Sequence, residues 1–242
     1  MEFKISSAVC TGRYHIEEDT PCQDAVCVRR GEKAVCVALA DGAGSRANSD
    51  IGATCVTQHT AHLLSQRFDS LWDMERAALA RFLVEECLKV LEAQEPPMYE
   101  MASTLLFFAA HRDGRFLTGH LGDGVQIQVL EGDEYPMVVS HPENGQYQNE
   151  TIFLTADDAQ EHFRIQKGML DRPGVFLMMS DGMAESLYLR KTGTPAPACG
   201  TIARWLAEGD EEVISQALVD NMKRTFSKHS GDDLSLAAIG WS

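Results

Sequence analysis

Three apolar runs in this chain each lead into an aspartate beside a glycine. The runs cover residues 35–40, 116–121 and 175–180, and they lead into Asp41-Gly42, Gly122-Asp123-Gly124 and Asp181-Gly182. Near the end of the sequence, the pair Asp232-Asp233 opens one more apolar run. Carboxylates at the ends of buried strands are oxygen ligands for a hard divalent cation, and adjacent glycines let backbone and ion approach. The pattern predicts a metal-dependent hydrolytic enzyme rather than a binding module.

Each of these acids, taken singly, also fits a simpler interpretation. Asp41 and Asp181 are typical turn residues, Asp233 follows Gly231 in a polar loop, and Asp123 suits a tight hairpin. The joint pattern favours the metal site. If the strands are neighbours the acids converge, and unpaired carboxylates raise each other's pKa unless cations lie between them. Ligation by oxygen alone favours Mg²⁺ or Mn²⁺ over zinc.

Two further residues are candidates for chemistry. Asp24 opens an apolar run after Cys22-Gln23, so it is either an ordinary polar strand start or an acid that reaches a metal through water. His15 lies in the loop before Asp24, where it is either an ordinary surface histidine or a group that binds phosphate and donates a proton near neutral pH. The chain contains neither a nucleophile elbow nor a phosphate loop.

Composition narrows the class of protein. The 242 residues carry a formal net charge of -15, which would repel nucleic acid. The seven cysteines are odd in number and form no Cys-x-x-Cys pair, which predicts a reducing, cytoplasmic setting. We expect no signal peptide and no membrane span, and therefore no membrane partner.

The periodicity predicts strands, two helices, more strands, two helices and a last strand. Strands are expected at 5–11, 24–30, 33–40, 105–110, 116–121, 125–130, 163–169, 175–179 and 234–241, and helices at 51–63, 77–91, 202–206 and 212–226. Asp50 is expected to cap the first helix. Hairpins are expected through Arg30-Gly31-Glu32 and through Gly122-Asp123-Gly124, a polar loop at 12–23 and an irregular insertion at 141–150. Since βαβ units are absent, two packed antiparallel sheets with helix pairs outside explain this order.

The motifs, in this order and at these intervals, resemble the metal-dependent protein Ser/Thr phosphatases of the PP2C (PPM) family, in a divergent bacterial branch. The matching segments are Gln23-Asp24-Ala25, Ala40-Asp41-Gly42-Ala43-Gly44-Ser45, Ser49-Asp50-Ile51-Gly52-Ala53, Ser103-Thr104-Leu105, Gly122-Asp123-Gly124, Ser180-Asp181-Gly182 and Asp232-Asp233-Leu234-Ser235. The resemblance implies one α+β domain over residues 1–242, a four-layer α-β-β-α sandwich of two antiparallel sheets flanked by helix pairs. The active site is expected at one end of the sheets.

The resemblance also implies roles for individual residues. Asp41, Asp181 and Asp233 would hold one Mn²⁺ or Mg²⁺ ion, Asp41 and the Gly42 carbonyl a second, and Asp123 a third. Asp24 matches an acidic position beside the metals. The chain departs from the family at four places: Gln23 replaces a common glutamate, Ala43 replaces a histidine of animal members, the phosphate-binding arginine is missing before Gln23, and Gly122-Asp123-Gly124-Val125 replaces the common Gly-Asp-Ser-Arg. Arg13 and His15 are the nearest substitutes for that arginine.

The implied reaction is hydrolysis of phosphoserine and phosphothreonine in proteins by direct attack of a metal-bridging hydroxide. Asp24, His15 and Asp41 are the expected catalytic residues, with His15 or a metal-bound water protonating the leaving group. The implied partners are a phosphorylated protein and an opposing Ser/Thr kinase. Two alternatives stay open: a pseudo-phosphatase that only binds phosphoproteins on the same fold, and a phosphoesterase for small molecules.

Overall fold

The computed structural model describes residues 1–143 and 151–242, which build two five-stranded antiparallel sheets. The first sheet joins, in spatial order, β1 (Phe3–Cys10), β12 (Leu234–Trp241), β9 (Gly174–Met179), β6 (Val125–Leu130) and β7 (Met137–Ser140). The second joins β2 (Asp24–Arg30), β3 (Ala34–Asp41), β4 (Leu105–His111), β5 (Arg115–Leu121) and β8 (Arg164–Met169). A small ribbon pairs β10 (Tyr188–Leu189) with β11 (Thr194–Pro195).

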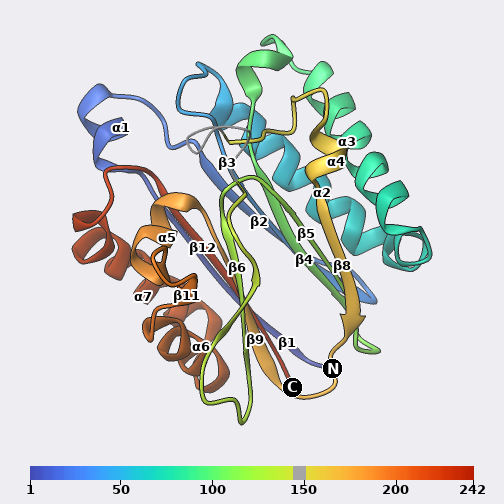
Figure 1. Ribbon diagram of the computed structural model, residues 1–242, viewed down its shortest axis with the longest axis vertical. Helices are drawn as coiled ribbons and strands as arrows, with labels where there is room; N and C mark the ends of the chain where they lie inside the picture. The colour runs from blue at the N-terminus through green and yellow to red at the C-terminus, as the bar shows by residue number, and fades with distance from the viewer. Residues whose placement is uncertain (144–150) are drawn as a thin grey trace.

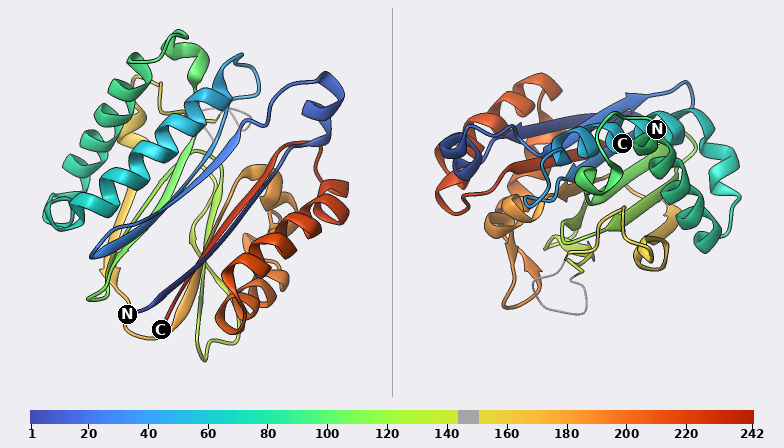
Figure 2. Two further views of the ribbon diagram at one scale, coloured as in Figure 1. Left: turned by 180° about the vertical axis from the view of Figure 1, so that it is seen from behind. Right: turned by 90° about the horizontal axis from the view of Figure 1, so that it is seen from above.

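Two helix pairs cover the outer faces of the sheets (Figures 1 and 2). The helices α2 (Ser49–Trp72) and α3 (Arg76–Glu92) pack on the second sheet, whereas α6 (Ala198–Glu208) and α7 (Glu211–Arg224) pack on the first. The shorter helices are α1 (Arg13–Glu18), α4 (Ala159–His162) and α5 (Asp181–Leu187), with 3₁₀ turns η1 (Met98–Met101) and η2 (Phe226–Lys228). The predicted four-layer α-β-β-α sandwich of α+β class is therefore confirmed.

The apolar runs of the sequence are strands buried on both faces. Along β3, Val35, Val37 and Leu39 pack between the two sheets, while the alternating residues Cys36 and Ala38 pack under the helices. A strand with two buried faces has no polar positions to alternate with, so it reads as a continuous apolar run.

Aromatic rings fill the space between the sheets. The ring of Phe108 stacks on Phe116, Phe176 and Trp241, with ring centroids 5.6, 4.5 and 6.0 Å apart. These four residues come from both sheets, so this cluster fastens one sheet to the other.

One predicted hairpin is confirmed and one is wrong. The strands β2 and β3 pair as expected, which sets Asp24 directly opposite Asp41. The strands β5 and β6 do not pair with each other, because β5 lies between β4 and β8 while β6 lies between β7 and β9. The segment Gly122-Asp123-Gly124 instead carries the chain from one sheet to the other. Asp-Gly after an apolar run marks a turn, but it does not specify which strand follows as partner.

Short elements account for the other differences. The polar segment 12–23 contains α1, the segment 137–140 forms β7, and α5 begins at Asp181. Helix α2 begins at Ser49 and its N-cap is Asn48, so Asp50 lies in the first turn and is not the cap. Residues 144–150 of the predicted insertion lie outside the described residues. In the described part of the chain, no helix is both long enough and apolar enough to cross a bilayer.

Candidate active site

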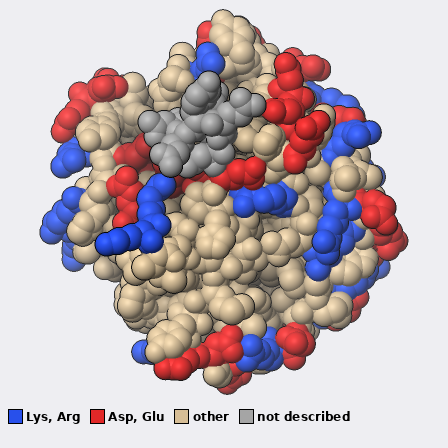
Figure 3. All heavy atoms as spheres, in the orientation of Figure 1, with Lys and Arg blue, Asp and Glu red and all other residues tan. Residues whose placement is uncertain are grey.

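The predicted site acids all lie at one end of the sandwich. Asp41 is the last residue of β3 and Asp24 the first of β2, and the register pairs them. Asp181 is the first residue of α5, separated from the end of β9 by one residue, and Asp233 directly precedes β12. Asp123 lies in the crossing between β5 and β6. On the face of the molecule that Figure 3 shows, acidic and basic side chains lie next to one another in its upper half.

The backbone around Asp41 is held in place by neighbours from three segments. The Asp41 N–H donates to Thr104 Oγ1 at 2.9 Å, and the Thr104 N–H donates to the Asp41 carbonyl at 2.8 Å. The Gly42 N–H donates to the Gln23 carbonyl at 3.0 Å. A Cβ on Gly42 would lie 2.8 Å from the Ser49 Cβ, so glycine is required here by close packing.

The Asp41 and Asp181 carboxyl groups lie close enough for each to shift the pKa of the other. Burial raises the pKa of Asp41 well above its ordinary value, and the charges of Asp24, Asp181 and Asp123 raise it further. Burial also raises the pKa of Asp181, while its interaction with Asp41 lowers it and the Asp232 charge raises it. Two neighbouring buried carboxyl groups cannot both ionise cheaply, so a cation between them would favour their charged forms.

Asp24 is buried beside this pair. Burial raises its pKa to about 8, against a lowering effect of the Ser180 and Ser235 hydroxyl groups. Neither carboxylate oxygen has a well-aligned hydrogen-bond donor among the described residues. Other buried oxygens without a hydrogen-bond partner among the described residues include Gln23 Oε1, Ser103 Oγ and Ser235 Oγ. Such a concentration of unsatisfied oxygens indicates a missing polar partner.

Asp123 lies at the side of the cluster that contacts Thr151. The Thr151 hydroxyl donates a short hydrogen bond to Asp123 Oδ2. Burial raises the pKa of Asp123, and so does the charge of Asp181. The crossing between the sheets therefore carries this acid to the site, although the hairpin predicted to hold it does not exist.

Asp233 has a different environment from the other acids. Its Oδ1 accepts a hydrogen bond from the Gly12 N–H at 2.6 Å, and its Oδ2 accepts one from the Gln23 N–H at 2.6 Å. The His15 Nδ1 lies 2.9 Å from the same Oδ2. Both oxygens thus bind the N-terminal loop, and Asp233 anchors the segment that carries α1 and Asp24.

Asp232 is a site residue that the sequence analysis did not single out. Its negative charge acts on Asp181. Burial raises its own pKa, and the Asp233 N–H donates to its Oδ1 at 2.8 Å. The doublet Asp232-Asp233 was the available signal, but residue type alone does not say which of two adjacent acids faces the cluster.

The basic residue that acts on the acid cluster is not one of those predicted from the sequence. The Arg13 guanidinium lies over the Tyr14 ring at 5.8 Å, and His15 is used by Asp233. Arg190, which the sequence analysis did not consider, is the basic residue whose charge acts on both Asp123 and Asp181. It has no ion pair within the described residues.

The segment that carries Arg190 is fixed beside the site. Its neighbour Tyr188 bonds through its hydroxyl group to His141 Nδ1 at 2.9 Å. Arg190 itself follows β10 on an exposed turn. Its position therefore suits the binding of an anion above the acid cluster.

The donor set fits a divalent cation, although the side chains do not enclose one as they stand. Among residues 1–143 and 151–242, no three Asp, Glu, His or Cys groups surround a common point closely enough to hold an ion. Asp41 and Asp181 nevertheless lie close enough to shift each other's pKa, and both oxygens of Asp24 lack partners. A hard cation among these carboxylates would offset their charge and satisfy the free oxygens.

Comparison with known proteins gives consistent matches. The profile of the protein phosphatase 2C family matches residues 11–223. The serine/threonine-protein phosphatase 3 of Escherichia coli (strain K12) is 28% identical over 169 residues, which cover 66% of this chain and 65% of that protein. The chain thus matches slightly less than two thirds of this relative's length.

Solved structures share the fold. The serine/threonine phosphatase Stp1 from Staphylococcus aureus superimposes with a TM-score of 0.68 at 13% identity, over 100% of this chain and 96% of that one. The catalytic domain of the serine threonine protein phosphatase PstP, in complex with two manganese ions, gives a TM-score of 0.65 at 15% identity, over 98% and 97% of the two chains.

Proposed function

The chain belongs to the protein phosphatase 2C family, and from this premise we propose that it is a metal-dependent protein Ser/Thr phosphatase. The observation that carries the proposal is the meeting of Asp41 and Asp181, from β3 and α5, in a buried cluster with Asp24. A binding module has no need for so many buried carboxylates, because each costs free energy when it is not neutralised.

We assign the ion-holding role to oxygen groups at the strand ends. Asp41 and Asp181 supply the shared carboxylates, the Gly42 carbonyl lies beside Asp41, and Asp123 supplies a further ligand on the Thr151 side. Asp232 takes the position that the sequence analysis gave to Asp233, since the oxygens of Asp233 already accept three hydrogen bonds. The all-oxygen set favours Mn²⁺ or Mg²⁺.

Bound divalent ions would lower the pKa of a coordinated water and offset charge on the phosphoryl group. The protein's own residues position that chemistry. Thr104 fixes Asp41 from the neighbouring strand, and Asp233 with His15 fixes the loop that leads to Asp24. The buried oxygens of Asp24 have no hydrogen-bond partner among the described residues, so Asp24 is suited to reach a bound ion through water.

Arg190 takes the phosphate-binding role for which Arg13 and His15 were the candidates. An arginine on an exposed turn beside the cluster can bind phosphate through two N–H groups. It also offers a local positive charge in a chain of net charge -15, which would otherwise repel an anionic substrate.

The same proposal extends to the partners of the enzyme and to its compartment. A Ser/Thr phosphatase acts on proteins phosphorylated by an opposing kinase, and residues 1–242 form one phosphatase domain for that purpose. All seven cysteines are free, as a reducing compartment such as the cytoplasm keeps them.

The test is a phosphatase assay on matched phosphoserine, phosphothreonine and phosphotyrosine peptides. With Mn²⁺ we expect phosphate release from the first two and little from the third, and a chelator should abolish it. Binding of these peptides without turnover would instead identify a pseudo-phosphatase. Faster turnover of nucleotides or sugar phosphates would identify a small-molecule phosphoesterase.

A further inference from the structure

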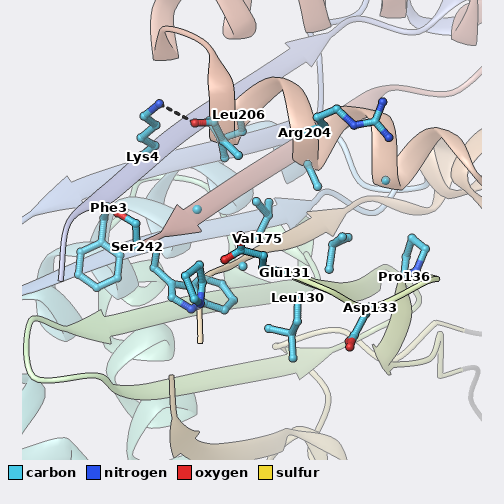
Figure 4. Close-up of a pocket in the computed structure, with 18 of the residues that line it drawn as sticks. Phe3, Lys4, Leu130, Glu131, Asp133, Pro136, Val175, Arg204, Leu206 and Ser242 are labelled. Atoms are coloured by element: carbon cyan, nitrogen blue, oxygen red, sulfur yellow. Dashed lines mark hydrogen bonds between the residues drawn. The ribbon is translucent and has the colours of Figure 1, made fainter. Parts of the chain in front are cut away.

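A cavity lies at the opposite end of the first sheet from the acid cluster. It has a volume of about 650 Å³ and is lined by the far ends of β6, β9 and β12 (Figure 4). Gly174 at the start of β9 pairs with Trp241 and with Leu130. Asp181 follows the other end of this six-residue strand, and at 3.3 Å per residue the two sites are separated by roughly 20 Å.

Small residues on facing elements leave this space open. Helix α6 presents Gly200, Ala203 and Ala207 to the cavity, at helical spacing along one face. A Cβ on Gly200 would meet only the Pro136 Cγ, at 3.8 Å, so there is room for a larger group. The helix and the sheet are therefore not in full contact here.

The walls of the cavity are apolar. Leu130, Val175 and Leu206 line it together with Trp241. Cavities of about 300–1,000 Å³ with apolar walls and a few polar groups are typical of small-molecule sites. The size and the lining thus fit the apolar body of a small organic molecule.

The free charge at the mouth of the cavity is mainly negative. Within the described residues, Glu2, Glu131 and Glu134 line it without an ion-pair partner, whereas Asp133 is paired with Arg172 at 2.8 Å. These acids belong to the chain start and to the turn after β6.

The basic residues at the mouth offset this charge only in part. The Lys4 Nζ donates to the carbonyls of Ala207 and Gly209 at 2.9 and 3.0 Å, so its donors serve the end of α6. Arg204 is exposed on α6, on the other side of the cavity from Asp133 (Figure 4). A ligand that enters between the turn and α6 therefore meets more free carboxylates than free cations.

We propose that this cavity binds a small amphipathic cation, with its apolar body between α6 and the sheet and its ammonium or guanidinium group beside the acids of the turn after β6. Charge complementarity selects the cation, because each free carboxylate at the mouth attracts it and repels an anion of the same shape. The exposed ring of Tyr135 on the same turn offers a further surface for a cation.

The test uses three probes with one chain length: decylamine, decanol and decanoate, each below its micelle-forming concentration. Calorimetry on the whole chain with chelator present should show saturable one-to-one binding of decylamine, at least tenfold tighter than decanoate. Equal or tighter binding of decanoate, or no saturable binding of decylamine, would overturn the proposal. Because no metal is present, the result is independent of phosphatase activity.

Variants locate the binding. Ala203→Phe should fill the cavity and abolish decylamine binding, while the matched exchange Ala78→Phe on the exposed face of α3 should leave it unchanged. Gly200→Leu serves the same purpose if Ala203→Phe does not fold. The double variant Glu131→Gln/Glu134→Gln should weaken the binding of decylamine at least fivefold and leave the binding of decanol unchanged. Unchanged decylamine binding in the filled variants would place it elsewhere and contradict the proposal.

Discussion

The carboxyl groups of Asp41 and Asp181 lie close enough for each to shift the pKa of the other, although one ends a strand of the second sheet and the other begins a helix after a strand of the first. This proximity therefore exists only when the two sheets are correctly packed. Metal binding at this pair would fasten the two sheets at the end where the acids meet, so stability and metal affinity are linked.

The first prediction concerns the pH dependence of the metal-free protein. The pKa of Asp24 is about 8 in the folded chain, and about 3.9 for an unfolded aspartate. The folded state therefore keeps a proton that the unfolded state has released. The contribution of Asp24 to the free energy of unfolding should therefore fall between about pH 4 and about pH 8.

Thermal unfolding with chelator across this pH range checks the prediction. Saturating Mn²⁺ should remove the decline, because the ions replace the protons as the partners of the carboxylates. Asp24→Asn should make the metal-free decline shallower, while Asp41, Asp181 and Asp123, whose pKa values burial also raises, keep part of it. A metal-free protein that becomes more stable from pH 4 to pH 8 would contradict the assigned environment.

The second prediction separates Asp232 from Asp233. Asp232→Asn should lower kcat/KM by at least about a hundredfold, as expected for loss of a group that supports transition-state charge, with little effect on stability. Asp233→Asn should keep metal-dependent activity within about tenfold. It should destabilise the fold by about 1–3 kcal/mol, because the amide leaves the Gly12 or Gln23 N–H without an acceptor.

Both variants are measured by Mn²⁺-dependent turnover and by denaturant unfolding. The opposite assignment, with activity lost at Asp233 and stability lost at Asp232, would return the ligand role to Asp233.

The third prediction tests Arg190 as the phosphate-binding residue. Arg190→Ala should lower kcat/KM for phosphopeptides by about 10- to 100-fold, which corresponds to the loss of a charged hydrogen bond. Lys191→Ala removes the neighbouring exposed cation and serves as the matched control. Equal losses in the two variants would show only a general effect of positive charge, and no loss in Arg190→Ala would return the role to Arg13 or His15.

The fourth prediction concerns the contact between the sheets. Phe108→Ala removes the ring that stacks on Phe116, Phe176 and Trp241, and should destabilise the protein by about 3–5 kcal/mol. Substitution of the exposed Tyr99, by comparison, should change the free energy of unfolding by less than about 0.5 kcal/mol. Equilibrium unfolding in urea measures both.

The sequence allowed the layers and most of the acids to be predicted, because the strands that carry them are long apolar runs with clear ends. Which strands pair with each other could not be predicted from the sequence. Gly122-Asp123-Gly124 has the composition of a hairpin turn, yet β5 and β6 belong to different sheets. Long-range pairing depends on the packing of the whole core, which a local turn signal does not contain.

The direction in which a side chain points could not be predicted from the sequence either. The roles of Asp232 and Asp233 are set by the N–H groups of Gly12 and Gln23, which come from the other end of the chain. Arg190 likewise reaches the cluster only through the fold of the turn after α5. Neither contact leaves a pattern in the local sequence.

The central claim is that Asp41 helps to hold divalent ions, and calorimetric titration of Mn²⁺ tests it most directly. The wild-type chain and the control Asp171→Asn, which alters an exposed loop acid, should bind Mn²⁺ with equal stoichiometry and affinity. Asp41→Asn should lose at least one bound ion and phosphatase activity while its metal-free form stays folded. Unchanged Mn²⁺ binding by Asp41→Asn, or no binding by the wild-type chain, would contradict the account.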